Sequence, residues 1–249
     1  MKNHISTPLL FFLTILVFSC SSVEDPLSCT SDSAIDLGFE SCLTFENDSD
    51  LLDYRDSIEF TIRESLTMVN TLMPISNLRI LVRSTSYNVI PEIGIGGFNP
   101  NSTDITISID PNFEDLTQSL NEELGPLMAH EIHHANRRRQ VGYGLTLLQT
   151  AVSEGMADCF SMEVYGIDPP RWSTALNQEE LISWFDTAST VWNDADYNHA
   201  DWFFGASLEI PKWTGYTIGY KLIKDFIQDN PGSTAAELVT EPATIFVEN

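Results

Sequence analysis

Basic residues are scarce in this chain of 249 residues. Lys and Arg together number 12 against 36 Asp and Glu, so the formal charge is −24 and the isoelectric point lies near 4.2. A surface this acidic repels a phosphate backbone, which argues against nucleic acid as a partner. The charge is expected to keep the protein solvated, and by itself it indicates no partner.

Apolar runs long enough to cross a bilayer are also missing. The run "LLFFLTILVF", Leu9 to Phe18, is ten residues long, which suits a signal-peptide core rather than a membrane span. Residues 1–19 are therefore expected to be a leader. Cys20 after "LVFS" resembles the lipidated cysteine of a bacterial lipobox, although Phe18 stands where a small residue is usual. We expect an exported, membrane-anchored lipoprotein of the cell envelope; the alternative is an ordinary secretory signal with an incidental cysteine.

Only three cysteines follow Cys20, namely Cys29, Cys42 and Cys159. Export makes a disulfide permissible, and Cys29 with Cys42 could close a small loop that leaves Cys159 free. The sequence alone does not decide this pairing.

Internal repeats and a second domain boundary are absent from the sequence pattern. Residues 20–49 begin with the polar, aperiodic stretch "SSVEDPLSCTSDSAIDLG" and are expected to form a tether or N-terminal arm. Residues 50–249 are expected to form one domain, because hydrophobic residues make up 43% of the chain and can fill a core.

Hydrophobic periodicity within that domain predicts an α+β fold that is mostly helical. Apolar residues recur at helical spacing from Asp50 to Met73, and strands are expected at 78–83 and 105–109. The intervening "IGIGGFNPNSTD" reads as a loop because it is rich in Gly, Asn and Pro. Further helices are expected at about 112–123, 126–141, 145–165, 174–192, 200–209 and 212–229.

Histidine is rare, yet three of the five histidines fall in "LMAHEIHHANRRR". His130, Glu131 and His134 form H-E-x-x-H, which places both imidazoles on one helix face where they can reach a single zinc ion. Glu131 is close enough to take a proton from a water on that metal. The alternative without a function is a surface helix with incidental histidines. The residues around the motif are apolar, which argues against a solvated helix face. A di-iron carboxylate bundle is set aside because no second Glu-x-x-His pair occurs.

A catalytic zinc site needs a third protein ligand, and three candidates can be weighed. His133 points about 100° away from His134 on a helix and is a poor ligand, so packing is expected for it. His199 is distant in sequence. Glu154 in "SEGMAD" lies on the next expected helix and is favoured, and Asp158 one turn later is expected to accept the free N–H of a ligating histidine. The alternative for Asp158 is a plain surface salt bridge.

Five blocks of the chain then resemble a known family, and they cover about residues 78 to 245. They are "MAHEIHHANRR", "VSEGMADCF", "DWFFG", "PKWTGYTIGYKLI" and "AAELVTEPATIF". The family consists of uncharacterised bacterial proteins described as predicted zinc-dependent proteases, and in broad class it is similar to the gluzincins. The resemblance implies a zincin-like fold with a small sheet and an HExxH active-site helix.

For the site, the resemblance implies Zn²⁺ on His130, His134 and Glu154, with Glu131 as general base. It also implies that an edge strand above the metal pairs with the substrate backbone, and residues 105–109 are the expected strand. The alternative for that segment is an ordinary core strand.

The sequence therefore predicts a zinc metallopeptidase that hydrolyses peptide or protein substrates, and it leaves the oligomeric state open. Tyr216 is the first candidate for donating a hydrogen bond to the oxyanion, ahead of Tyr220 and His199. Gly215 and Gly219 beside these tyrosines are expected to let their helix approach another closely. Two other functions stay open: a non-catalytic zincin-like lipoprotein that binds metal or peptide, and a zinc amidohydrolase acting on a peptide linkage of the cell envelope.

Overall fold

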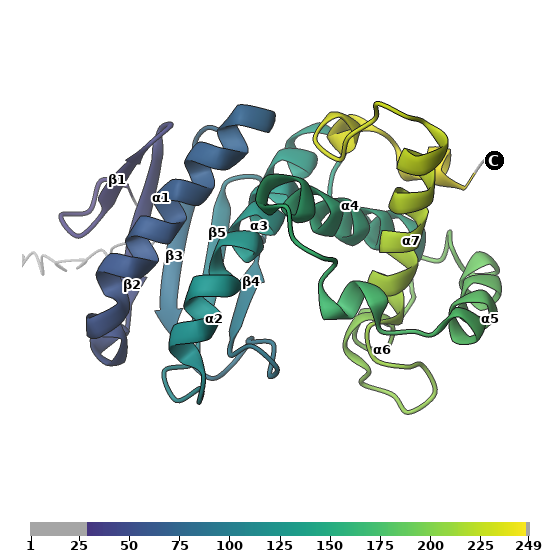
Figure 1. Ribbon diagram of the computed structural model, residues 1–249, viewed down its shortest axis with the longest axis horizontal. Coiled ribbons are helices and arrows are strands. Elements are labelled where there is room, and N and C mark those ends of the chain that lie inside the picture. The colour runs from purple at the N-terminus through teal and green to yellow at the C-terminus, as the bar shows by residue number, and fades with distance from the viewer. Residues whose placement is uncertain (1–28, 248–249) are drawn as a thin grey trace, which may run out of the picture.

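The computed structural model describes residues 29–247, which form a mixed β-sheet with helices packed beside it (Figure 1). Within this range the sheet has five strands in the order β1-β2-β3-β5-β4. β3 runs parallel to β2 and β5, whereas β1 and β4 run antiparallel to their neighbours. The strands are β1 (Ile35–Gly38), β2 (Ser41–Glu46), β3 (Arg79–Ser84), β4 (Ile95–Phe98) and β5 (Asp104–Ile109).

The described part of the chain is richer in helix than in strand, as the sequence predicts, and the α+β class is confirmed. Four short 3-10 helices are also formed by the described residues. The α-helices are α1 (Arg55–Leu72), α2 (Leu116–Glu122), α3 (Leu124–Gln140), α4 (Leu147–Tyr165), α5 (Gln178–Ser189), α6 (His199–Phe204) and α7 (Thr214–Asp229). The 3-10 helices are η1 (Asp48–Tyr54), η2 (Arg171–Thr174), η3 (Glu237–Thr240) and η4 (Ala243–Phe246). Among the described residues, no helix is both long and apolar enough to cross a membrane.

Helix α1 shows how the apolar spacing becomes packing. Ile58, Ile62, Leu66 and Val69 recur every three or four residues, and all four are fully buried. The helix ends when Met73 adopts an extended conformation, because the ring of the following Pro74 disfavours a helical residue before it. The expected start at residue 50 is too early, since η1 occupies that segment.

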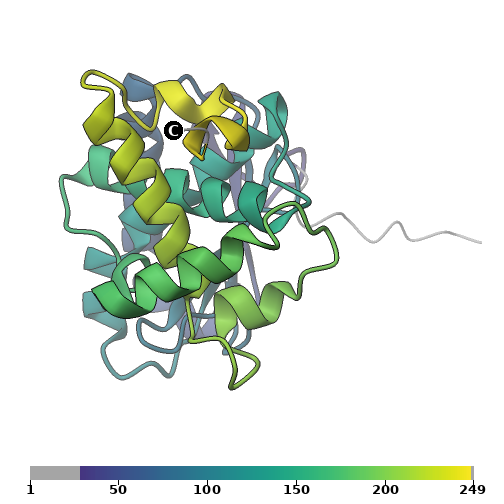
Figure 2. The ribbon, with the colours of Figure 1, turned by 90° about the vertical axis from the view of Figure 1, so that its right-hand side faces the viewer.

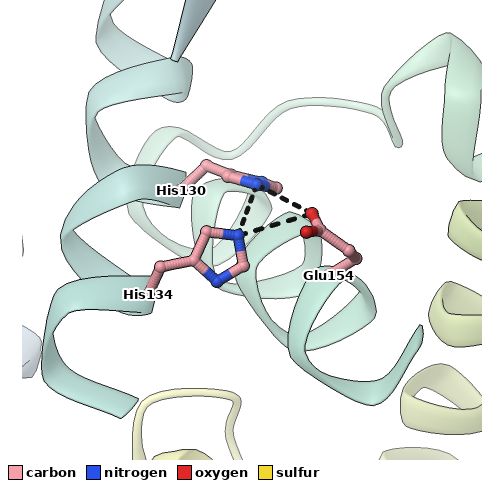
Figure 3. Close-up of side chains that lie close together, drawn as sticks. All are labelled: His130, His134 and Glu154. Carbon is pink, nitrogen blue, oxygen red and sulfur yellow. Dashed lines mark hydrogen bonds and ion pairs between the residues drawn. The ribbon is translucent and has the colours of Figure 1, made fainter. Parts of the chain in front are cut away.

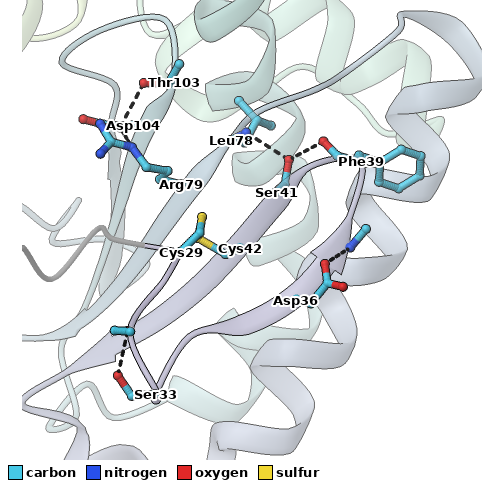
Figure 4. The surroundings of a disulfide bond; sticks show 12 residues. Cys29, Ser33, Asp36, Phe39, Ser41, Cys42, Leu78, Arg79, Thr103 and Asp104 are labelled. Atoms are coloured by element: carbon cyan, nitrogen blue, oxygen red, sulfur yellow. Dashed lines mark hydrogen bonds and ion pairs between the residues drawn. A yellow bond between two sulfur atoms is a disulfide. The ribbon is translucent and has the colours of Figure 1, made fainter.

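The prediction of an N-terminal arm at residues 20–49 is wrong for residues 35–46, which form two strands. β1 and β2 are strands of the sheet, and β2 pairs in parallel with β3 over five residues. A disulfide joins Cys29 to Cys42 in β2 (Figure 4). Cys159 is free and buried. The sequence of this segment shows no alternation that predicts a strand. β2 forms because it pairs with β3, which lies more than thirty residues later in the chain. The leader and Cys20 lie outside the described residues.

The expected edge strand at residues 105–109 is also corrected. β5 lies between β3 and β4, so it is an interior strand, and its isoleucines Ile105, Ile107 and Ile109 are fully buried. The edge is β4, which falls within the segment expected to be a loop. On its outer side only the bridge between Ile90 and Ile95 is formed by described residues.

Helices α4 to α7 lie beyond α3, away from the β1 edge of the sheet (Figure 1). Viewed from that side, α5, α6 and α7 stand in front of the sheet (Figure 2). α4 and α7 approach closely at two glycines: a Cβ on Gly155 would lie 2.1 Å from the backbone of Gly219. The expected close helix approach at Gly219 is therefore confirmed, whereas Gly215 packs against the ring of Phe203. The helix expected at 200–209 ends early, because Gly205 takes a left-handed conformation.

Candidate metal centre

The HExxH residues lie in the middle of α3, where the helix is buried on nearly every side. His130 is 8% exposed, and Glu131 and His134 are each 4% exposed. The helix packs against β4 and β5 on one side and against α1 and α4 on others. Burying histidine and glutamate side chains is unfavourable unless they have hydrogen-bond or metal partners. We therefore expect a ligand or a hydrogen-bond network at the centre of this helix.

Glu154 reaches the two histidines from α4 (Figure 3). Its Oε2 lies 3.2 Å from His130 Nε2 and 3.4 Å from His134 Nε2, and the two Nε2 atoms are 2.9 Å apart. Three potential ligand atoms therefore converge on one point from two helices. His199 and His133 are not part of this group.

The arrangement fits a zinc ion. Ligands at about 2.0–2.1 Å in a tetrahedral arrangement lie roughly 3.3 Å from one another, close to the three separations found here. Two imidazole nitrogens and one carboxylate oxygen are donors that zinc accepts. In addition, Oε2 of the neighbouring Glu131 is buried and has no hydrogen-bond partner among the described residues, as expected of a carboxylate that faces a ligand.

Asp158 orients His130, as the sequence predicts. It is fully buried on α4, and its Oδ1 lies 2.9 Å from His130 Nδ1. Because a carboxylate accepts, Nδ1 carries the proton and the Nε2 lone pair is directed at the shared point. Trp172 Nε1 also donates to Asp158, at 3.1 Å, and Ser173 donates from its hydroxyl. The surface salt bridge considered for Asp158 is excluded by its burial.

The charges of the ligand group support one another. Burial alone would raise the pKa of the Glu154 carboxyl, but His134 and His130 outweigh burial and hold this pKa well below its usual value. Burial lowers the pKa of His130, yet the carboxylates of Asp158 and Glu154 raise it well above its usual value. At neutral pH the metal-free His130 therefore carries a second proton, which a divalent cation must displace from Nε2, whereas Glu154 is already the carboxylate that the cation needs.

Glu131 lies between the ligands and the edge strand. A Cβ on Gly97 of β4 would be 2.3 Å from Glu131 Oε1, so only glycine leaves room for the carboxylate there. Burial raises the pKa of Glu131, and the positive charges of His130 and His134 oppose that rise. A carboxyl group with a raised pKa beside a metal site is suited to accept and return a proton.

Tyr143 and Arg138 also belong to the site, although sequence reasoning missed them. The Tyr143 hydroxyl donates to Glu154 Oε1, and its ring meets that of His134 edge-on at 5.1 Å. The Arg138 guanidinium lies 4.5 Å from the centre of the Tyr143 ring. The i+4 spacing from His134 to Arg138 was a signal for the arginine, but "VGYG" around Tyr143 carries no periodic signal.

The oxyanion candidates occupy different places. Burial raises the pKa of Tyr216 well above its usual value, and the carboxylates of Glu154, Asp158 and Glu131 add to that rise, so its hydroxyl lies near the site and stays protonated. His199 is stacked on Phe203 at 4.6 Å and lies within the electrostatic reach of Glu154.

Tyr220 and His133 lie in the core rather than at the site. Burial raises the pKa of Tyr220, and the charges of Cys159 and Asp158 add to that rise. Its side chain is buried one turn beyond Tyr216. His133 is fully buried beside Phe160, with ring centres 5.3 Å apart. The backbone of Ala235 lies close to its ring, and burial lowers the pKa of His133 well below its usual value, in keeping with the packing role expected for it.

Comparison with known proteins assigns the chain to a family. A family model described as "Predicted Zn-dependent protease (DUF2268)" matches residues 58–248. The chain belongs to this family. The match to the predicted Zn-dependent protease family begins within α1, so β1, β2 and the disulfide lie outside it. It includes all three candidate zinc ligands and Glu131.

One curated relative of the chain is the Uncharacterized protein YjaZ of Bacillus subtilis (strain 168). The two are 28% identical over 129 residues, which is 49% of each chain. The chain therefore spans about half the length of this relative. No solved structure matches the chain.

Proposed function

We propose that the protein is a zinc-dependent metallopeptidase with a zincin-like catalytic domain. The observation that carries this proposal is the convergence of His130, His134 and Glu154 beside the buried, unpartnered Oε2 of Glu131. These three residues would hold the zinc ion, which supplies Lewis acidity to a carbonyl and lowers the pKa of a bound water to about 7. Membership of a family described as predicted Zn-dependent proteases supports the same reading.

Glu131 is the general base in this proposal. Its Oε2 would accept a proton from the attacking water and return it to the leaving amine nitrogen, which keeps the proton count balanced over the reaction. The absence of a hydrogen-bond partner on Oε2 leaves that atom available. A protein that only binds metal or peptide needs no such base, so the intact Glu131 favours catalysis over the non-catalytic alternative.

The edge strand β4 would bind the substrate backbone. A peptide can add to an exposed sheet edge through main-chain hydrogen bonds, and β4 is the strand nearest to Glu131. Gly97 and Phe98 follow the point where Ile90 covers the edge. Cleavage of a peptide linkage in the cell envelope would use the same residues, and the amidohydrolase alternative therefore differs in substrate and not in site.

We also propose that the protein is exported and anchored to the membrane through a lipid on Cys20. The support comes from the leader-like apolar run before Cys20 and from the disulfide between Cys29 and Cys42. Disulfides persist in oxidising compartments outside the cytosol. The acidic charge makes nucleic acid an unsuitable partner, so peptide or protein is the proposed substrate.

The test combines metal content with cleavage of a mixed peptide library. Purified wild type should contain about one zinc per chain, and His134→Ala should lose most of it because two remaining ligands rarely hold catalytic zinc. His199→Ala is the matched control and should retain zinc. Full zinc occupancy in His134→Ala would show that the ligand assignment is wrong.

Glu131→Gln separates binding from catalysis. The amide cannot accept a proton, so this variant should keep zinc and fold while losing nearly all hydrolysis. Glu122→Gln makes the same change on an exposed position of α2 and should leave hydrolysis intact. Equal activity of Glu131→Gln and wild type would exclude Glu131 as the base.

A further inference from the structure

Three arginines in succession follow the HExxH motif at the end of α3, in a chain that has only 12 basic residues. Two of them are held by backbone carbonyls. Arg137 donates to Val239 O at 2.9 Å, and Arg139 donates to Ser102 O at 3.0 Å. Their guanidinium groups therefore tie α3 to neighbouring segments, and only Arg138 is left for another role.

Arg138 lies on the side of α3 that carries the catalytic residues. It follows His134 by four residues and Glu131 by seven, so the three side chains share one helix face. Helical side chains tilt toward the N-terminal end of the helix, which directs Arg138 back toward the site. The electrostatic influence of Glu131 and Glu154 on Arg138 agrees with that placement.

The donors of Arg138 are not engaged within the described part of the chain. Its guanidinium stacks on the Tyr143 ring at 4.5 Å, and it makes no hydrogen bond or ion pair with a described residue. Its Nε is buried without an acceptor. A guanidinium with a buried Nε and no acceptor among the described residues, in a chain with 36 acidic residues, is available to bind an anion from outside.

We propose, building on the metallopeptidase function, that Arg138 binds a carboxylate of the substrate and thereby sets specificity. The planar guanidinium offers parallel N–H donors that match the two oxygens of a carboxylate, while the Tyr143 ring holds the plane in position. The carboxylate is the free C-terminus of the peptide or an acidic side chain next to the cleaved bond. Without Arg138, the strongly acidic chain would repel either group.

A purely supporting role predicts a different outcome. If Arg138 only held Tyr143, or donated to the oxyanion, its loss would slow the cleavage of every peptide by the same factor. A carboxylate-binding residue changes the ratio between substrates with and without the carboxylate. The ratio of kcat/KM values, rather than activity alone, is therefore the informative quantity.

The first experiment compares three peptide libraries that differ only in whether and where the peptide carries a carboxylate. One has free C-termini, one has amidated C-termini without acidic residues, and one has amidated C-termini with Asp or Glu. Wild type should prefer one carboxylate-bearing library about ten- to hundredfold in kcat/KM, the range of a charged hydrogen-bonded pair. The preferred library identifies the source of the carboxylate.

Arg138→Met should remove that preference, so that its kcat/KM values for the carboxylate-bearing and neutral libraries become equal. Arg55→Met is the matched control, because Arg55 also stacks on a ring, that of Phe45 at 4.4 Å, on a different element. It removes the same charge and should keep the preference. A wild type without preference, or a preference that survives in Arg138→Met, would overturn the proposal.

A binding measurement tests the role of Arg138 without relying on peptide cleavage. Calorimetry with zinc-loaded Glu131→Gln should show tighter binding of the carboxylate-bearing peptides than of neutral ones, and Glu131→Gln/Arg138→Met should show equal binding. If wild type cleaves no library, the peptidase function fails and the binding result alone decides the role of Arg138. Equal binding of all peptides to Glu131→Gln would contradict the proposed carboxylate-binding role of Arg138. A preference that persists in the double variant would contradict it as well.

Discussion

At the scale of single residues, the site consists of ionisable groups that are buried together. His130, Glu131, His134, Glu154 and Asp158 are each at most 8% exposed. Burying such groups is costly unless each has a partner, and the partners here form a chain from Ser173 through Asp158 and His130 to Glu154. That chain leaves few orientations for the imidazole of His130, so the ligands need little rearrangement when a metal binds.

The proposed role of Tyr216 as oxyanion donor can be tested by removing its hydroxyl group alone. Its hydroxyl makes no hydrogen bond with a described residue, and its ring packs against Phe203 at 5.2 Å. Tyr216→Phe should keep that packing and remove a donor to the oxyanion, which lowers kcat about a hundredfold or more. Zinc content and melting temperature should stay nearly unchanged.

Tyr220→Phe is the control for this measurement, because Tyr220 lies one turn further along α7 and is buried away from the zinc ligands. It should retain the kcat of wild type. A Tyr216→Phe variant with wild-type kcat would remove Tyr216 from the mechanism. A variant that unfolds would assign Tyr216 to the core instead.

At the scale of elements, the contact between α4 and α7 connects the ligand group with the oxyanion candidate. Gly155 directly follows the ligand Glu154, and Gly219 lies three residues after Tyr216. Because these glycines touch through their backbones, α7 comes close enough to bring Tyr216 beside the site. The zinc ligands themselves come only from α3 and α4.

Gly219→Ala should therefore disturb catalysis without removing the metal. A Cβ at this position would be 1.9 Å from the carbonyl oxygen of Ala151, so the helices must move apart. We expect a loss of about 1–3 kcal/mol in the free energy of unfolding, despite the gain in helix propensity, together with lower kcat and unchanged zinc content.

Gly215→Ala is the matched control on the same helix. The new methyl group would meet the far end of the Phe203 ring, which can turn aside more easily than a backbone. It should lose less stability than Gly219→Ala. An equal or smaller loss in Gly219→Ala would contradict the role assigned to the contact between α4 and α7.

At the scale of the whole molecule, the N-terminal strands and the candidate site lie toward opposite ends of the strand order. β1 and β2 form one end of the strand order and β4 forms the other, so the disulfide at Cys42 lies at the far side from the zinc ligands (Figure 1). A lipid on Cys20, nine residues before Cys29, would thus hold the protein by the end of the sheet remote from the site.

Cys20→Ala should release the protein from membranes into the soluble fraction. The described residues include no helix that is long and apolar enough to span a bilayer. Fractionation after a high-salt wash measures this, and Cys159→Ala serves as a control because Cys159 is buried in the core. Continued sedimentation of Cys20→Ala with membranes would exclude the lipid anchor.

The sequence by itself determined the local parts of the site. The four-residue spacing of His130 and His134 places them on one helix face whatever surrounds the helix, because that face follows from 3.6 residues per turn. Helical periodicity also placed Glu154 and Asp158 on the next helix, one turn apart. The main helices and the α+β class follow from the same short-range pattern of apolar residues.

Only the tertiary structure decided which distant segments meet. "IGGF" in β4 has two glycines and no alternating pattern, so it becomes a strand only because β5 lies beside it. β2 likewise depends on pairing with β3, and β1 depends on pairing with β2. Tyr143 joins the site through its hydrogen bond to Glu154 and its contact with Arg138, and such contacts leave no periodic trace because Tyr143 lies outside both helices.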